Sequence, residues 1–189
     1  MVEHKLGQLA AAEKLAAQGH IDLFYADESG VSSEGYVPYG WQFPGENVHI
    51  PVEKGFRLNC WGLVSRRSDC RWATSVQAID SRFVFDQLER FSLELARETF
   101  VVLDQARIHT CGLIRSQLSV WQQRGLYVIY LPQYSPHLNL AETLWRKLKK
   151  EWLRPEDYIC DGTLAYAVNR CLANVGTELV IHYSPFNST

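Results

Sequence analysis

Two short apolar runs that each end in an aspartate restrict the fold of this chain more than any other feature. Residues 21–27 read IDLFYAD and residues 99–104 read TFVVLD. Apolar runs of this length are typical of central strands that are buried on both faces. If the two runs are parallel neighbours in one sheet, Asp27 and Asp104 approach each other at its edge. The runs therefore predict an α/β domain.

The rest of the chain supplies the helices and the antiparallel part of such a sheet. Residues 3–18 place apolar residues at helical spacing, and Gly19 can end that helix. Residues 28–30 are turn-like, and 56–66 with 71–79 partly alternate as a β-hairpin. The elements expected after the hairpin are a helix at 81–97 with Ser81 as N-cap, the strand that ends at Asp104, a helix around 112–124, a strand at 126–131, a helix through about 153 and a last helix at 161–174. This order predicts a mixed sheet flanked by helices.

Composition limits the classes of function. The chain has 189 residues, enough for one domain, and 19 basic against 21 acidic side chains. A net charge of −2 argues against nucleic-acid binding through bulk charge, although a local basic face remains compatible with it. The five cysteines form no CxxC pair, so neither a zinc site nor a disulfide framework is expected. No signal peptide or membrane span is recognisable, which predicts a cytoplasmic protein without membrane contact.

A third acid lies in the stretch LPQYSPHLNLAETLW, residues 131–145. Glu142 has a structural explanation, because Asn139 can be the N-cap and Glu142 the third helical residue of a capping box. Asp27 and Asp104 can likewise be turn residues. Taken singly, these structural explanations are the simpler ones.

The three acids together suggest a different chemistry. Carboxylates clustered at one end of a sheet repel one another and are hard to desolvate. Divalent ions relieve that repulsion, and Mg²⁺ prefers oxygen ligands from a few carboxylates and substrate phosphates. Two such ions about 4 Å apart can promote phosphodiester cleavage.

Three stretches carry a family resemblance: YADESG, VVLDQARIHT and YLPQYSPHLNLAETLWRKLKK. They resemble the DDE transposases of the mariner superfamily, and the bacterial insertion-sequence branch called the six-thirty family is the most similar. The block YGWQFPGE is also similar. The resemblance covers about residues 20–155. Two positions depart from the family pattern, with Gln105 where Asn is frequent and Leu140 where Pro is frequent.

The resemblance implies a ribonuclease H-like fold and metal-dependent cleavage and transfer of DNA strands during transposition. It assigns the catalytic and metal-binding triad to Asp27, Asp104 and Glu142, with two Mg²⁺ or Mn²⁺ ions expected beside substrate DNA. The implied partners are the element ends, the target DNA and a second copy in an active homodimer. Family members carry a helix-turn-helix region that this chain does not supply, so we expect a catalytic domain of a nucleoid-associated protein.

Several neighbouring residues are weaker candidates. Glu28 should point to the face opposite Asp27 and be structural or support the site. His109 could contact DNA or the active site, although a lone histidine is more often a hydrogen-bonding residue. Tyr134 and Ser135 could position the loop before Glu142, and Trp41 could contact DNA or pack. The basic residues expected to follow DNA phosphates are His109, Arg146, Lys147, Lys149 and Lys150.

The expected organisation is a linker-like helix at 1–19, a catalytic domain at 20–176 and a tail at 177–189. Two other functions remain open from the residues. The chain could be another ribonuclease H-like nuclease, or an inactive transposase remnant that serves as a DNA-binding or dimerisation module.

Overall fold

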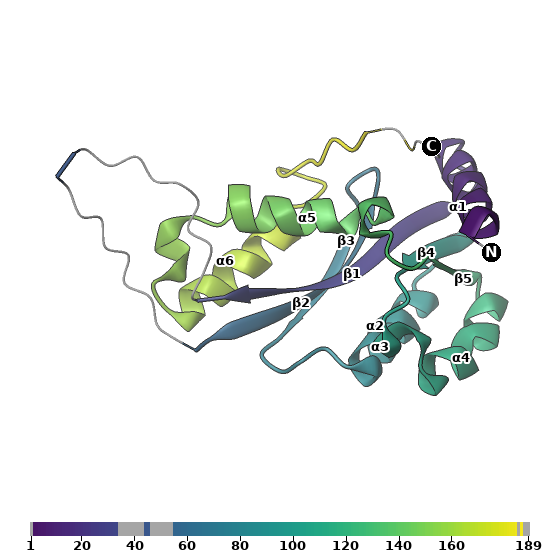
Figure 1. The fold of residues 1–189 in the computed structure, drawn as a ribbon, viewed down its shortest axis with the longest axis horizontal. Coiled ribbons are helices and arrows are strands. Elements are labelled where there is room, and N and C mark those ends of the chain that lie inside the picture. The colour runs from purple at the N-terminus through teal and green to yellow at the C-terminus, as the bar shows by residue number, and fades with distance from the viewer. Residues whose placement is uncertain (1, 34–43, 46–54, 185, 187–189) are drawn as a thin grey trace.

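The computed structural model describes residues 2–33, 44–45, 55–184 and 186. In these ranges the strands form one five-stranded sheet in the order β3-β2-β1-β4-β5 (Figure 1). The strands are β1 (Asp22–Ser32), β2 (Arg57–Ser65), β3 (Cys70–Ser75), β4 (Thr99–Leu103) and β5 (Leu126–Tyr130). β1 is central, with β2 antiparallel on one side and β4 parallel on the other. The predicted mixed sheet and its hairpin are therefore confirmed.

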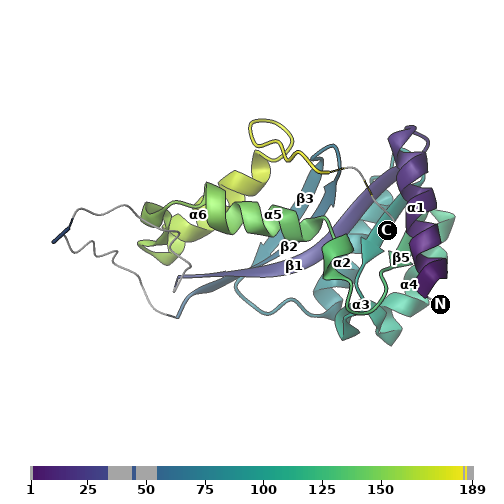
Figure 2. The ribbon, with the colours of Figure 1, turned by 45° about the horizontal axis from the view of Figure 1, so that its top comes forward.

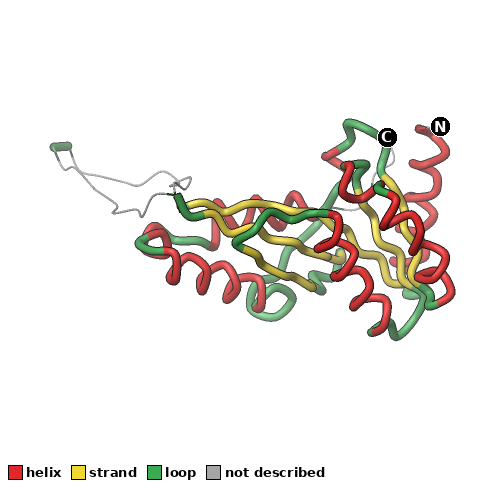
Figure 3. Tube along the Cα trace, turned by 90° about the horizontal axis from the view of Figure 1, so that it is seen from below, coloured by secondary structure: helices red, strands yellow, loops and turns green. Residues whose placement is uncertain are grey.

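Helices cover both faces of the sheet (Figures 2 and 3). They are α1 (Val2–Ala17), α2 (Ser81–Leu93), α3 (Arg107–Thr110), α4 (Gly112–Gln123), α5 (Ala141–Lys147) and α6 (Asp161–Ala173), with a π-helical turn at Leu148–Trp152 and 3₁₀ turns at Pro136–Leu138 and Pro155–Tyr158. One face packs against α2 and α4, and the other against α1, α5 and α6. No helix in the described part of the chain is long and apolar enough to cross a membrane.

Strand β1 is longer than the sequence predicts. The turn expected at residues 28–30 is wrong, because β1 continues to Ser32. Residues 28–32 pair with residues 57–61 of β2, whose hydrogen bonds stabilise an extended backbone through a polar stretch. Asp27 therefore lies within a strand rather than at its end.

Helix α2 starts at the predicted place with a different cap. Ser81 is its first residue, and Asp80 is the N-cap, accepting a hydrogen bond of 2.8 Å from the Phe83 N–H. The helix ends at Leu93 instead of residue 97, and β3 ends at Ser75 instead of residue 79. Of the aromatic block 39–46, only residues 44–45 are described, so Trp41 lies outside the described residues.

Both ends of the described chain pack on the sheet. Helix α1 buries Leu9 and Ala12 against residues of β1 and β5. The Ser68 hydroxyl accepts the Ile181 N–H at 2.9 Å, and Ile181 is buried. The proposed limits 1–19, 20–176 and 177–189 stay a prediction, but helix 2–17 and the segment around residue 181 contribute to the same core as the sheet.

Candidate active site

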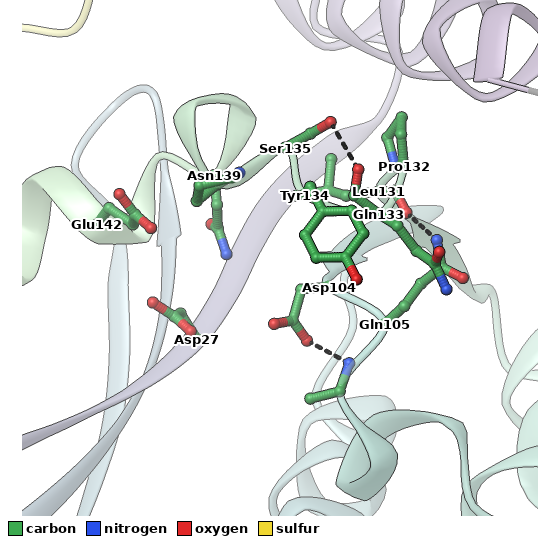
Figure 4. A pocket seen from close by; sticks show the side chains of 12 residues that line it. Asp27, Asp104, Gln105, Leu131, Pro132, Gln133, Tyr134, Ser135, Asn139 and Glu142 are labelled. Atoms are coloured by element: carbon green, nitrogen blue, oxygen red, sulfur yellow. Dashed lines mark hydrogen bonds between the residues drawn. The ribbon is translucent and has the colours of Figure 1, made fainter.

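A cleft of about 340 Å³ lies where β1, β4 and the start of α5 meet. The carboxylates of Asp27, Asp104 and Glu142 face it from these three elements (Figure 4). The remaining lining comes from residues 105–106, the loop 131–136 and Asn139. The structure thus brings the three sequence-predicted acids to one cleft.

Asp27 faces the cleft because helix α5 can lie close to the sheet. Its partner in β2 is Gly62. A Cβ atom at Gly62 would lie 2.8 Å from the indole ring of Trp145 in α5, so only glycine leaves room for this packing. The contact holds the first turn of α5, which carries Glu142, beside the part of β1 that carries Asp27.

Asp104 follows directly after β4 and is half-exposed. Its Oδ1 accepts the N–H of Ala106 at 2.9 Å, so Asp104 is a turn residue as its residue type predicts. The same oxygen lies 2.6 Å from Nδ1 of His109. No hydrogen bond to its Oδ2 is found among the described residues, and this oxygen faces the cleft (Figure 4). Asp104 therefore forms the turn through Oδ1, and its Oδ2 remains available to bind a ligand.

Asn139 caps the start of the helix that carries Glu142, but it lies one residue before Leu140, which directly precedes α5, so Glu142 is the second and not the third residue of α5. The backbone of Asn139 is extended, and its Oδ1 accepts the Ala141 N–H at 3.2 Å. Its Nδ2 donates to the Ala26 carbonyl at 3.1 Å, which ties the helix start to the residue before Asp27. The other half of the predicted capping box is absent, because the Asn139 N–H donates to the Pro136 carbonyl at 2.8 Å. The Glu142 carboxylate is therefore not used for capping.

Two departures from the family pattern have structural explanations. Leu140 is helical with φ −60°, an angle that proline would also adopt, and its side chain packs against two core clusters. Gln105 lines the cleft, and its amide donates to the Leu131 carbonyl at 2.6 Å. This bond joins the end of β4 to the loop before Glu142.

The charges in the cleft are not balanced. Burial, followed by the negative charges of Glu28, Asp104 and Glu142, raises the pKa of Asp27 to about 7, against one backbone hydrogen bond that lowers it. The hydrogen bond with His109 lowers the pKa of Asp104, and the Ala106 N–H adds to this against partial burial. Negative charge therefore accumulates around Asp27.

His109 is fully buried under the cleft, so of its two predicted contacts, DNA and the active site, the structure is compatible with the second. Its ring lies between Asp104 Oδ1 at 2.6 Å and Glu28 Oε2 at 3.2 Å. Burial opposes a charged ring, but these two carboxylates outweigh it and raise the pKa of His109 to about 9. Glu28 points to the face opposite Asp27, as predicted, and this is how it reaches His109.

The predicted basic residues do not form one face. Lys147 is paired with Glu151 at 2.8 Å, whereas Arg146 and Lys150 are exposed. Lys149 is half-buried, which lowers its pKa, and it is close enough to Asp27 to interact with its charge. Among the predicted phosphate contacts, Lys149 interacts with the charge of Asp27, although it does not line the cleft.

Two features of the cleft were not predicted from the sequence. Tyr134 is 97% exposed and has a left-handed backbone with φ 57°, which is uncommon for a residue with a Cβ. The link from Glu28 to His109 was also missed, although the position of His109 five residues after Asp104 was visible in the sequence. Among the described residues, no three histidine, cysteine, aspartate or glutamate side chains are close enough to form a complete metal site.

The sheet order and the acid-lined cleft define a ribonuclease H-like domain of the kind found in transposases and integrases. The sequence profile of the DDE superfamily endonucleases matches residues 22–165, and the chain belongs to this family. No curated protein sequence matches the chain.

Solved structures have the same fold. A Mos1 transposase paired-end complex with the left transposon end has a TM-score of 0.54 at 16% identity, covering 92% of this chain and 61% of that one. The Mos1 strand transfer complex has a TM-score of 0.52 at 15% identity, covering 93% and 62%. A simian T-cell lymphotropic virus intasome, in complex with the PP2A regulatory subunit B56 gamma, has a TM-score of 0.59 at 11% identity, covering 88% and 52%. The chain thus spans about three-fifths of the Mos1 chains and half of the intasome chain.

Proposed function

We propose that this chain is the catalytic domain of a DNA transposase of the bacterial six-thirty branch, and that Asp27, Asp104 and Glu142 bind the divalent ions that its reaction needs. The observation that carries this proposal is the charge imbalance in the cleft. Partial burial and the charges of Glu28, Asp104 and Glu142 destabilise the charged form of Asp27, and no cation among the described residues that line the cleft offsets them.

The donor set fits Mg²⁺ or Mn²⁺. Both ions prefer carboxylate oxygens, and Mg²⁺ keeps open positions for water and substrate phosphate. Three carboxylates that line an open cleft without closing on one another suit such a partly filled coordination sphere. Two bound ions would supply Lewis acidity, lowering the pKa of water and stabilising the charge that develops on a cleaved phosphodiester.

The protein's own residues would then orient the DNA. Asn139 and the Gly62 contact fix Glu142 opposite Asp27, and His109 with Ala106 fixes one oxygen of Asp104. Lys149, whose pKa responds to the charge of Asp27, would bind a phosphate, and Arg146 in α5 and Lys150 in the following π-helical turn would contact others. The exposed ring of Tyr134 at the rim can stack on a base.

Cleavage would proceed without a covalent protein–DNA intermediate, because the triad offers metal ligands and no nucleophile. Water would attack a phosphodiester at the element end and release a 3′-hydroxyl. That hydroxyl would then attack a target phosphodiester in the same cleft and displace the 3′-oxygen of the target strand. We further propose a homodimer in the active complex, a cytoplasmic location on the nucleoid, and a helix-turn-helix region that recognises the element ends.

The test is nicking of supercoiled plasmid with Mn²⁺ or Mg²⁺, combined with calorimetric metal binding by the same protein. We expect nicking and metal binding in the wild type and loss of both in Asp104→Ala. The matched control is Asp86→Ala, which removes a carboxylate on α2 that is paired with Arg82 and lies outside the cleft lining. Equal nicking or equal metal binding by wild type and Asp104→Ala would overturn the assignment.

A further inference from the structure

We propose that His109 is a positioning residue for Asp104, and that Glu28 acts through it by holding the imidazole ring in place. This inference rests on the proposed metal site and adds two residues to its machinery. The contacts form a line from Glu28 on β1 through His109 on α3 to Asp104 at the end of β4. Glu28 and His109 lie on the sheet face opposite Asp27, and the line ends at Asp104 in the cleft.

The first step is the fixed oxygen of Asp104. His109 Nδ1 lies 2.6 Å from Oδ1, and the Ala106 N–H donates to the same oxygen at 2.9 Å. Two contacts on Oδ1 prevent the carboxylate from rotating about its Cβ–Cγ bond. The other oxygen, Oδ2, faces the cleft, so Asp104 presents this oxygen to the cleft in a fixed orientation (Figure 4).

The second step is the fixed ring of His109. It is completely buried, and the indole of Trp61 packs against it with ring centroids 5.7 Å apart. The Tyr130 hydroxyl donates to the main-chain carbonyl of His109 at 2.9 Å, which holds the helical turn that carries the ring. Apolar packing alone would fix the plane of the ring but would not determine which nitrogen faces Asp104.

The third step is Glu28, which selects the orientation of the ring. Its Oε2 lies 3.2 Å from His109 Nε2, and neither of these buried atoms makes a hydrogen bond with any other described residue. Each is therefore the main polar neighbour of the other, as an ion pair whose alignment is imperfect for a hydrogen bond. A flipped ring would place carbon atoms against Asp104 Oδ1 and Glu28 Oε2, and leaving the buried Oε2 atom without a polar neighbour is costly.

Residues that orient a ligand matter for metal affinity. When the hydrogen bonds that orient a metal ligand are lost, metal affinity typically falls by about 10- to 100-fold, because metal binding must then also order the ligand. Adjacent residues of β1 would thus serve the same site from opposite faces of the sheet. Asp27 would bind metal directly, and Glu28 would act on Asp104 through His109.

The experiment measures Mn²⁺ affinity by calorimetry and metal-free thermal stability for a set of variants. His109→Phe keeps an aromatic ring without nitrogens, His109→Gln keeps a donor that is too short to span both carboxylates, and Glu28→Gln keeps the shape of Glu28 without its charge. The control is Glu89→Gln, because Glu89 accepts hydrogen bonds from Gln117 and Trp121 at a site away from the cleft.

We expect His109→Phe to weaken Mn²⁺ binding by about 10- to 100-fold and Glu28→Gln by about 3- to 10-fold. The double variant should bind no more weakly than His109→Phe alone, because Glu28 acts only through the ring. Glu89→Gln should lower stability and leave Mn²⁺ affinity unchanged. If His109→Phe does not fold, His109→Gln should still show at least a 3-fold loss.

Two outcomes separate this inference from the proposed function. Wild-type Mn²⁺ affinity in folded Glu28→Gln and His109→Gln would overturn the positioning role while leaving the metal site intact. Additive losses in the Glu28 and His109 double variant would overturn the claim that Glu28 acts through His109. Wild-type protein that binds no Mn²⁺, or Asp104→Ala that binds it equally well, would overturn the proposed metal site itself.

Discussion

Replacing Asp27 by asparagine should stabilise the metal-free protein, an unusual result for a partly buried residue of a central strand. The negative charge of Asp27 is disfavoured by burial and by the charges of Glu28, Asp104 and Glu142. Asparagine has nearly the same shape, but it cannot ionise. The substitution therefore removes the unfavourable charge while keeping the packing between β1 and α5.

The magnitude follows from the pKa. A rise from 3.8 to about 7 corresponds to at most ~4 kcal/mol of destabilisation well above pH 7, since each tenfold change in proton binding is worth about 1.4 kcal/mol. The amide of asparagine must also be desolvated, so we expect a net gain of about 1–3 kcal/mol at pH 8. For a domain of this size, that gain raises the melting temperature by about 2–4 °C per kcal/mol.

The pH dependence has a definite sign. Because the pKa of this acid is higher in the folded than in the unfolded state, the folded protein binds more protons between about pH 4 and 7. Wild-type stability therefore falls as the pH rises through that window, and it does so less in Asp27→Asn. The advantage of the variant should be greatest above pH 7 and should nearly vanish at pH 4.

Bound metal should make wild type more stable than Asp27→Asn. A ligand that binds only the folded state stabilises it by about 4.1 kcal/mol at 1,000 times its Kd, which exceeds the advantage expected for the variant. Wild type should gain this in Mn²⁺, whereas Asp27→Asn lacks one ligand and should gain much less. The assay is thermal unfolding at pH 8 and at pH 4.5, in EDTA and in Mn²⁺.

The control is Asp22→Asn in the same strand, where the carboxylate lies 3.7 Å from Arg97. Removing that exposed pair should change stability by at most about 1 kcal/mol, equally with and without metal. The reasoning would be refuted if Asp27→Asn were less stable than wild type in EDTA by an amount independent of pH. That outcome would identify Asp27 as a structural hydrogen-bond acceptor.

Three further substitutions test how the cleft is assembled. Asn139→Ala should lower the free energy of unfolding by about 1–2 kcal/mol in chemical denaturation and also weaken Mn²⁺ binding. The control is the cap variant Asp80→Ala, which should lower stability only. Unchanged Mn²⁺ affinity in Asn139→Ala would contradict this prediction. Gly62→Ala should lower the free energy of unfolding by about 1–3 kcal/mol, because its Cβ would lie 2.8 Å from an indole ring. The control is Gly7→Ala, whose Cβ would meet nothing within 4 Å and which should be neutral or stabilising. Equal effects of the two substitutions would argue against the close packing. Tyr134→Ala should weaken DNA binding in a fluorescence anisotropy titration by about 1–3 kcal/mol, while Tyr134→Phe should retain it; equal affinity in all three proteins would exclude stacking.

Much of the fold and part of the cleft could be read from local sequence patterns. The apolar runs at 21–26 and 99–103 are central parallel strands because only a sheet covered on both faces buries such segments. Strand alternation correctly placed Asp27 and Glu28 on opposite faces. Asn139 was recognisable as a helix cap because capping depends on residues only two positions apart.

Other features depended on pairing with distant segments. The stretch after Asp27 has turn-like composition, yet it is a strand because β2 pairs with it. Helix α5 can approach Asp27 only because the residue opposite in β2 is glycine, a contact that joins segments more than 80 residues apart. Neither feature leaves a signal in the local pattern of β1 or α5.

The sequence by itself determined which residues could carry the chemistry, and the tertiary structure decided how they are used. The three acids were identifiable because each lies in or beside a strand or at a helix start, where backbone geometry sets the direction of the side chain. The burial of His109 between Asp104 and Glu28 was decided only by the fold, because β1 and β4 must first pair before a residue 81 positions from Glu28 lies 3.2 Å from it. The electrostatic environment of a side chain is a sum over neighbours in space, and most of those neighbours are remote along the chain.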